Sequence, residues 1–213
     1  MGKIIMFGGE KGGSGKSTTA TNIAVYLVHE GLDVLLLDAD KQATSSKFIG
    51  RRNEAGYKEI HLAQRLGDIY KSAMDFGKRY QVVIIDAGGR DSKELRSGMV
   101  ATDLLYVPNK ASQADLETLP VVDELISLSR GMNPTLIARA LLCMAPTNER
   151  IREIDDAREL LLQFPELPLT DCIIHERKIY RDALTLGAGV VELTNMAAKA
   201  EIQLLGQEIL YGF

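Results

Sequence analysis

The sequence predicts an α/β fold, a mostly parallel twisted sheet with helices on both faces. Short, almost wholly apolar runs such as VLLL and VVII recur along the chain and have the length of strands. Stretches of helical period separate these runs, and buried strands alternating with helices are typical of βαβ units. No repeat, low-complexity tract or Pro/Gly/Ser-rich linker interrupts the 213 residues. We therefore expect a single domain over residues 1–213.

The expected strands are the apolar runs themselves. In chain order they are KIIMFG (3–8), DVLLLD (33–38), a weaker run near KEIHLA (58–63), QVVIID (81–86), DLLYVP (103–108), LIARALLCM (136–144) and LTDCIIH (169–175). The expected helices lie between them, where apolar residues recur at helical rather than alternating spacing. They are 16–30, 113–130, 149–163, 177–186 and 195–211.

Composition indicates an ordinary globular protein of the cytoplasm. Apolar residues make up 46% and charged residues 25%, and the formal net charge is −4. Contact with nucleic acid would therefore have to come from a local basic patch. Cys143 and Cys172 lie in unrelated contexts, so we expect core residues rather than a disulfide or a metal cluster. The apolar start KIIMFGG is too short for a secretory signal.

A glycine-rich loop follows the first strand, with the sequence GGEKGGSGKSTT over residues 8–19. Glycines 12, 13 and 15 let the backbone turn so that successive N–H groups point at phosphate oxygens, and the following helix adds its positive N-terminus. Lys16 is placed to reach the β- and γ-phosphates, and the Ser17 hydroxyl to coordinate Mg²⁺. The strict pattern G-x-x-x-x-G-K-[ST] is not met, because Glu10 stands at the first glycine position.

The segment KGGSGKST resembles the deviant Walker A loop of the ParA/MinD (SIMIBI) class of P-loop ATPases, with Lys11 as the additional lysine. The resemblance implies ATP as ligand, contacted by Lys11, Gly12, Gly13, Ser14, Gly15, Lys16, Ser17 and Thr18. It also implies a homodimer in the ATP state, in which Lys11 reaches the phosphates of the partner's ATP. A second cation at that place would stabilise the charge that develops on the transferred phosphoryl group.

Two further segments resemble the switches of that class. DADKQ at the end of the second strand is similar to switch I, which implies that Asp40 orients the attacking water and Asp38 helps to hold the hydration shell of Mg²⁺. Lys41 replaces the usual proline of this motif. QVVIIDAGG looks like the Walker B strand and switch II. This likeness implies that Asp86 accepts hydrogen bonds from Mg²⁺-bound water, and hard oxygen groups of this kind suit Mg²⁺. Gly88 and Gly89 would let the backbone approach the γ-phosphate.

The resemblance extends over nearly the whole chain, through GRDSKELRSGMVATDLLYVPNKASQADL and the C-terminal section that begins RKIYRDALTLGAGVVEL. By that likeness the loop APTNER borders the adenine, where Thr147 and Asn148 could hydrogen-bond the base. The same residues could instead cap the helix expected at 149–163. Both interpretations stay open at this point.

The C-terminal section resembles short ParA proteins, which implies a nucleoid-associated ATPase of plasmid or DNA partition that binds DNA without sequence preference. Arg177, Lys178 and Arg181 are the candidate DNA contacts, by their position in the family. A second basic cluster, Lys41, Lys47, Arg51, Arg52 and Lys58, could also neutralise phosphates. For each cluster a merely solvated face is the alternative. Because the glycine loop begins at Gly8, we expect no N-terminal helix-turn-helix and a separate small centromere-binding or adaptor protein (ParB- or ParG-like) that stimulates hydrolysis.

Two other functions are compatible with the same loop. A MinD-like membrane switch would need basic residues beside an apolar face of the C-terminal helix, but the tail AEIQLLGQEILYGF has two glutamates and no basic residue. We therefore expect no membrane partner. A metabolic, carboxylate-activating synthetase of the deviant P-loop class would suit the two aspartates equally well. The C-terminal section matches ParA-like proteins better, which favours partition or cargo positioning.

Overall fold

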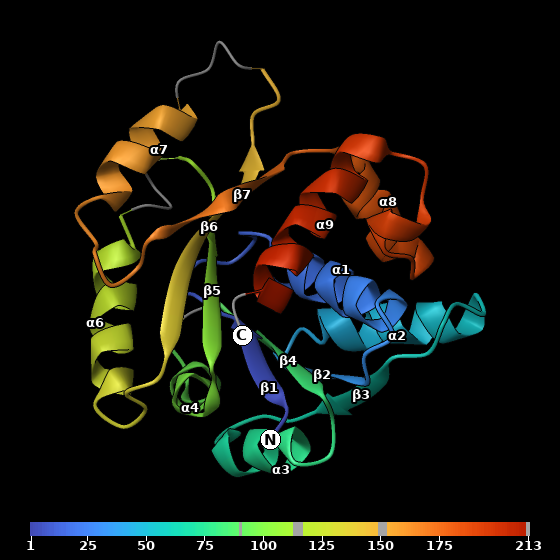
Figure 1. The fold of residues 1–213 in the computed structure, drawn as a ribbon, viewed down its shortest axis with the longest axis horizontal. Coiled ribbons are helices and arrows are strands. Elements are labelled where there is room, and N and C mark those ends of the chain that lie inside the picture. The colour runs from blue at the N-terminus through green and yellow to red at the C-terminus, as the bar shows by residue number, and fades with distance from the viewer. Residues whose placement is uncertain (90, 113–116, 149–152, 212–213) are drawn as a thin grey trace.

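The computed structural model describes residues 1–89, 91–112, 117–148 and 153–211, which contain a seven-stranded sheet (Figure 1). The strands are β1 (Lys3–Phe7), β2 (Val34–Ala39), β3 (His61–Gln64), β4 (Val82–Ala87), β5 (Leu104–Asn109), β6 (Ile137–Ala145) and β7 (Leu169–His175). Their order in the sheet is β3-β2-β4-β1-β5-β6-β7, and every pair of neighbours runs parallel. The predicted fold class is confirmed, and all seven predicted strands are present.

Helices connect the strands within the described ranges. They are α1 (Lys16–His29), α2 (Thr44–Glu54), α3 (Tyr70–Gly77), α4 (Lys93–Ala101), α6 (Leu119–Arg130), α7 (Glu153–Leu161), α8 (Lys178–Leu186) and α9 (Met196–Tyr211), with the 3₁₀ turn η1 at Val190–Glu192. Helix α1 begins at Lys16, as predicted. The sequence patterns specified no helix at α2, α3 or α4. The first residues of the predicted helices 113–130 and 149–163 lie outside the described residues.

The sheet is buried on both faces, which explains why its strands read as continuous apolar runs. Along β1, Ile5 and Phe7 pack into one core and Ile4 and Met6 into the other. Helices α1, α2, α8 and α9 cover the first face, and α3, α4, α6 and α7 cover the second (Figure 1). On the first face the rings of Phe7 and Tyr106 stack with their centroids 5.4 Å apart.

The strand order places a ligand site beside β1 and β4. From β1 the chain crosses through α1 to β2 on one side, whereas from β4 it crosses through α4 to β5 on the other. The two connecting helices cover opposite faces of the sheet, so a crevice forms where the carboxyl ends of β1 and β4 meet. The glycine loop follows β1 at this point.

Cys143 and Cys172 are free thiols buried in the core, as predicted. In the part of the chain that the structure describes, no helix combines the length and the apolar character needed to cross a membrane.

Candidate nucleotide-binding site

A cavity of about 700 Å³ opens at the carboxyl ends of β1, β2 and β4. Its lining from the glycine loop and α1 consists of Glu10, Lys11, Gly12, Gly13, Gly15, Lys16, Ser17 and Thr18. Asp40, after β2, and Gly89, after β4, complete the wall together with residues of the Asp40–Thr44 segment and Met144 of β6. Three separate segments that the sequence singled out therefore share one cavity.

The conformation of the glycine loop requires glycine at three of its positions. Gly9 has φ 152°, Gly13 has φ 71° and Gly15 has φ 99°, all positive values that other residues rarely adopt. A Cβ on Gly15 would also lie 3.2 Å from the Cβ of Cys143, so β6 limits the space behind the loop. Nothing lies within 4 Å of a Cβ added to Gly12, which leaves this part of the loop open for a ligand.

The two lysines of the loop have different environments. Lys16 is 7% exposed, and its ammonium group donates to the carbonyl oxygen of Lys11 and to the Ser14 hydroxyl oxygen. Ser14 is buried and does not line the cavity, and its hydroxyl instead contacts Lys16 within the loop. Lys11 lines the cavity, and its ammonium group makes no ion pair within the described ranges.

Asp38 and Asp86 are neighbours in register at the ends of β2 and β4. Both are completely buried. Both oxygens of Asp38 are used: Oδ1 accepts from the Asp40 N–H at 3.1 Å, and Oδ2 accepts from the N–H and hydroxyl of Ser46 at 2.7 and 2.6 Å. Asp38 therefore holds the switch I segment and the first turn of α2 in place.

Asp86 keeps one oxygen free. Its Oδ2 accepts from the Ser45 hydroxyl at 2.6 Å, whereas its buried Oδ1 has no hydrogen-bond partner among the described residues. Burial raises the pKa of Asp86 to about 7, and the neighbouring carboxylates Asp38 and Asp40 add to the rise. The hydroxyls of Ser45 and Ser17 oppose it. A buried acceptor without a partner is suited to bind a cation or a hydrogen-bond donor.

The donor set fits Mg²⁺. The candidates are hard oxygen ligands, namely the carboxyl group of Asp86, whose Oδ1 has no hydrogen-bond partner in the described residues, and the nearby hydroxyl of Ser17. Across the described residues, no group of three or more His, Cys, Asp or Glu side chains is arranged to hold a metal by itself. Mg²⁺ usually takes few protein ligands and completes its shell with water and phosphate oxygens, so this site suits a nucleotide-bound ion.

The two switch segments touch each other and the loop. The Oδ1 of Asp40 accepts from the Gln42 N–H at 2.9 Å. A Cβ on Gly88 would lie 3.1 Å from the Asp40 Cγ, and one on Gly89 would lie 2.9 Å from the backbone of Lys11 and Gly12. Neither glycine has a positive φ. Both are required for space, because the segment after β4 packs directly on the loop and on Asp40.

A second, smaller pocket of about 100 Å³ adjoins the cavity and shares Gly15, Thr18 and Met144 with it. Its walls are mainly apolar and come from the ends of β6 and β7 and from α8, including Cys143, Ile174, His175, Tyr180 and Leu184. Burial raises the pKa of Cys143 to about 12, so its thiol stays protonated.

Thr147 and Asn148, the predicted adenine contacts, are exposed and line neither pocket. Met144 and the apolar residues of the second pocket were not identified from the sequence as candidate site residues. Met144 has φ 52°, a left-handed conformation that places it between the two pockets. Sequence patterns assign a methionine at the end of a strand to the hydrophobic core, so nothing in the sequence identifies Met144 as a pocket residue.

Each predicted DNA contact forms an ion pair within the chain. Arg177 donates through Nε and a terminal nitrogen to Oε1 of Glu201, at 3.0 and 2.8 Å, and is three-quarters buried. Lys178 pairs with Asp182 at 2.7 Å and Arg181 with Glu176 at 3.3 Å, both on the surface. The predicted cluster is therefore two exposed pairs beside one buried pair.

The second basic cluster needs a correction at Arg52. Its side chain is completely buried and pairs bidentately with Glu192 at 2.9 and 2.8 Å, so it cannot contact DNA. The other side chains of the cluster that have partners donate to backbone carbonyl groups: Lys47 to Gln42, Arg51 to Leu184 and Lys58 to Val28. The cluster mainly fastens α2 to its surroundings.

The residues that line both pockets lie within the part of the chain that matches a known protein family. A sequence model described as the CobQ/CobB/MinD/ParA nucleotide binding domain matches residues 5–190. The chain is 27% identical over 161 residues to the chromosome-partitioning ATPase Soj of Thermus thermophilus, a match that spans 62% of this chain and 65% of that protein. It is 26% identical over 204 residues to the maintenance of carboxysome distribution protein A of Halothiobacillus neapolitanus, spanning 94% and 93%. The fold resembles that of the septum site-determining protein MinD of Pyrococcus horikoshii, solved with Mg-ADP, with a TM-score of 0.76 and 19% identity over 98% of this chain and 96% of that chain.

Proposed function

Because the chain belongs to the CobQ/CobB/MinD/ParA nucleotide-binding family, we propose that it is a Mg²⁺-dependent ATPase that positions DNA or another cargo in the cell. One observation carries the proposal. The glycine loop and both aspartate-bearing segments line one cavity, beside a buried carboxylate with an unpartnered oxygen. We propose that residues 1–213 form one such ATPase domain.

The residues of the cavity suit phosphoryl transfer to water. The loop N–H groups and the N-terminus of α1 would bind the phosphates, with Lys16 adding a fixed positive charge. Asp40 lines the cavity, where it would orient the attacking water. Asp86 and Ser17 would hold Mg²⁺, with Asp38 fixing the adjacent backbone. When bound, Mg²⁺ neutralises the charge on the β- and γ-phosphates.

The second pocket is the better candidate for the base. It is contiguous with the phosphate cavity through Gly15, Thr18 and Met144, and its apolar walls suit a flat aromatic ring. Arg177 lines this pocket, so its effect on the protein would come through the nucleotide rather than through DNA. Adenine contacts from Thr147 and Asn148 stay a prediction from the family resemblance.

We further propose that ATP closes two subunits over a pair of nucleotides. Two observations support a role for Lys11 in this contact: it lines the cavity, and it makes no ion pair within the described residues. The ATP-bound dimer would bind DNA without sequence preference on the nucleoid, through the exposed Lys178 and Arg181. A small centromere-binding or adaptor protein would then stimulate hydrolysis. The named functions of the relatives, chromosome partitioning and carboxysome distribution, support a role of this kind.

Light scattering tests the dimer and the two lysines together. With a non-hydrolysable ATP analogue and Mg²⁺, the wild type should double its mass. Lys16→Ala should bind no nucleotide and stay monomeric, because it loses the charge fixed beside the phosphates. Lys11→Ala should bind the analogue and still stay monomeric, because it lacks only the cation that reaches the other subunit.

Lys41→Ala is the matched control, since it removes an exposed lysine from the neighbouring switch segment and should dimerise normally. A wild type that remains monomeric when saturated with the analogue would overturn the proposed dimer. A Lys11→Ala protein that dimerises like Lys41→Ala would remove Lys11 from the interface.

A further inference from the structure

Two consecutive serines in the first turn of α2 each hold a different buried carboxylate. The Ser45 hydroxyl donates to Oδ2 of Asp86 at 2.6 Å, and the Ser46 hydroxyl donates to Oδ2 of Asp38 at 2.6 Å. The two aspartates face each other in register on β4 and β2. The start of α2 is thus attached to both acidic groups of the candidate metal site.

The two serine contacts differ in what they leave free. Asp38 has both oxygens occupied, because the Asp40 N–H takes its Oδ1. On Asp86, Oδ2 accepts from Ser45, which is itself completely buried, whereas Oδ1 has no hydrogen-bond partner in the described part of the chain. A hydroxyl has one proton to donate, so the Ser45 bond decides which oxygen of Asp86 is left for a ligand.

The turn that presents these serines is conformationally strained. Ala43, just before α2, has φ 54° and ψ 40°, a left-handed conformation that costs a non-glycine residue free energy. Such a conformation persists only where the surrounding contacts determine it. The contacts around this turn include the Ala43 N–H, which donates to the Asp40 carbonyl oxygen at 3.0 Å, and the hydrogen bonds from Ser45 and Ser46 to the aspartates.

We infer that Ser45 is a positioning residue for metal binding: its hydroxyl orients Asp86 so that the free Oδ1 faces the Mg²⁺ position, and it couples the start of α2 to occupancy of that position. This inference rests on the proposed function. Because binding linkage is reciprocal, a metal held by Asp86 stabilises the docked start of α2 to the same extent that docking favours the metal.

Calorimetric titration of Mg²⁺ into the complex with ADP tests the inference without turnover. Ser45→Ala should weaken Mg²⁺ binding about 10- to 100-fold, as loss of an outer-sphere partner typically does. ADP affinity in the presence of a chelator should not change, because Ser45 does not line the nucleotide cavity. Ser129→Ala, which removes another buried serine hydroxyl far from the site on α6, should leave both affinities unchanged.

A double-mutant cycle separates positioning from general damage. In an Asp86→Asn background, adding Ser45→Ala should have no further effect on Mg²⁺ affinity, because the group that Ser45 orients is already gone. Hydrogen exchange supplies a second measurement: Mg²⁺ should protect the first amides of α2 in the wild type but not in Ser45→Ala. If Ser45→Ala does not fold, Ser45→Cys retains the size with a weak donor and should weaken Mg²⁺ binding in the same way.

The possible results separate a failure of the proposed role of Ser45 from a failure of the proposed Mg²⁺ site. A wild type whose ADP complex binds no Mg²⁺ refutes the metal site and the inference with it. A wild type that binds Mg²⁺, with a folded Ser45→Ala protein that binds it equally well, overturns only the role of Ser45.

Discussion

Asp86 should make the stability of the metal-free protein depend on pH. Burial raises its pKa to about 7 in the folded state, against about 4 in an unfolded chain. Between these values the folded state holds a proton that the unfolded state has released. The stabilising contribution of this group is therefore complete below about pH 4 and is lost as the pH rises to about 7.

Asp86→Asn removes the titrating group and should flatten this part of the pH profile. The full effect is on the order of 4 kcal/mol, because each pH unit between the folded and unfolded pKa values corresponds to about 1.4 kcal/mol. Urea unfolding in a chelator at about pH 5 and about pH 8 gives the difference for each protein. An equal loss of stability in wild type and Asp86→Asn over this interval would show that Asp86 is not the group responsible.

At the residue scale, the sequence predicted the groups whose chemistry has a local pattern. The glycine loop, Asp40 and Asp86 all follow apolar strands, so their meeting at one edge of the sheet could be predicted from the strand assignments. The position of Ser45 beside Asp86 could not be predicted, because serine is common at helix starts and no helix was expected at α2. Its contact with Asp86 depends on the turn at Ala43, which only the folded backbone shows.

At the element scale, the least predictable parts are short and only half buried. Helix α2 buries four residues, Ser45, Phe48, Ile49 and Arg52, of which only two are apolar, so its helical period is weak. Strand β3 lies at the edge of the sheet with no fully buried side chain, which explains why the run at 58–63 was faint and displaced. The central strands are buried on both faces and were predicted within two residues of their ends.

Helix α2 should depend on Arg52 for its attachment to the body of the protein. The buried guanidinium donates to the Lys58 and Gly187 carbonyl groups as well as to Glu192. Although burial acts to raise the pKa of Glu192, hydrogen bonds from Arg52 and then His29 keep it below its usual value. Removing Arg52 would leave Glu192 charged and poorly compensated.

Arg52→Met should therefore destabilise the protein by about 3–5 kcal/mol, the usual effect of breaking one side of a buried pair. Arg51→Met is the matched control on the same helix, because Arg51 is exposed and donates only to the Leu184 carbonyl group. Its effect should be about 1 kcal/mol or less. Chemical denaturation of both variants measures the difference, and equal losses of stability would contradict the special role of Arg52.

At the scale of the whole molecule, the fold class and the convergence of the three nucleotide segments could be predicted from one sequence, because both follow from the alternation of strands and helices. The pairing of charged side chains on the surface could not be predicted in this way. The net charge of −4 and the run of basic residues at 177–181 do not show that each of these cations faces a carboxylate. Such pairing depends on side chains from α9 and on the turns of α8, and it divides the cluster into buried and exposed parts.

The exposed part of that cluster should carry DNA binding. Surface ion pairs contribute about 1 kcal/mol or less, so DNA phosphates can replace Asp182 and Glu176 as partners of Lys178 and Arg181 at little cost. Arg177 is held mostly buried by Glu201 and is not available in this way. The double variant Lys178→Glu, Arg181→Glu should therefore lose DNA association in the presence of a non-hydrolysable ATP analogue, while nucleotide binding is retained.

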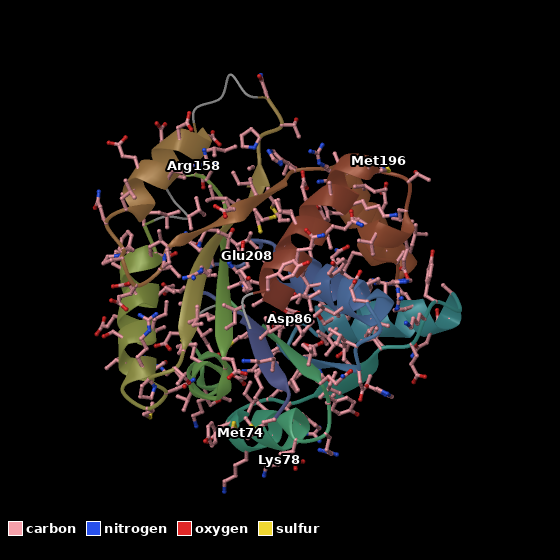
Figure 2. All side chains as sticks on the ribbon, in the orientation of Figure 1. Met74, Lys78, Asp86, Arg158, Met196 and Glu208 are labelled. Atoms are coloured by element: carbon pink, nitrogen blue, oxygen red, sulfur yellow. The ribbon has the colours of Figure 1, made fainter. Side chains whose placement is uncertain are left out.

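The matched control is Lys71→Glu, Lys78→Glu, which changes the net charge equally at α3 and at the residue that caps its C-terminus. Helix α3 lies at the lower edge of the view and α8 at the upper right (Figure 1), and Figure 2 labels Lys78. Fluorescence anisotropy with labelled duplex DNA should show about tenfold weaker binding, or more, for the α8 variant. The slope of log binding constant against log salt concentration should also become shallower, by about one unit for each phosphate that is no longer neutralised. Arg177→Ala should instead weaken nucleotide binding, because its side chain lines the second pocket. Equal DNA affinities for the α8 variant and the α3 control would exclude α8 as the DNA-binding surface, since both carry the same overall charge.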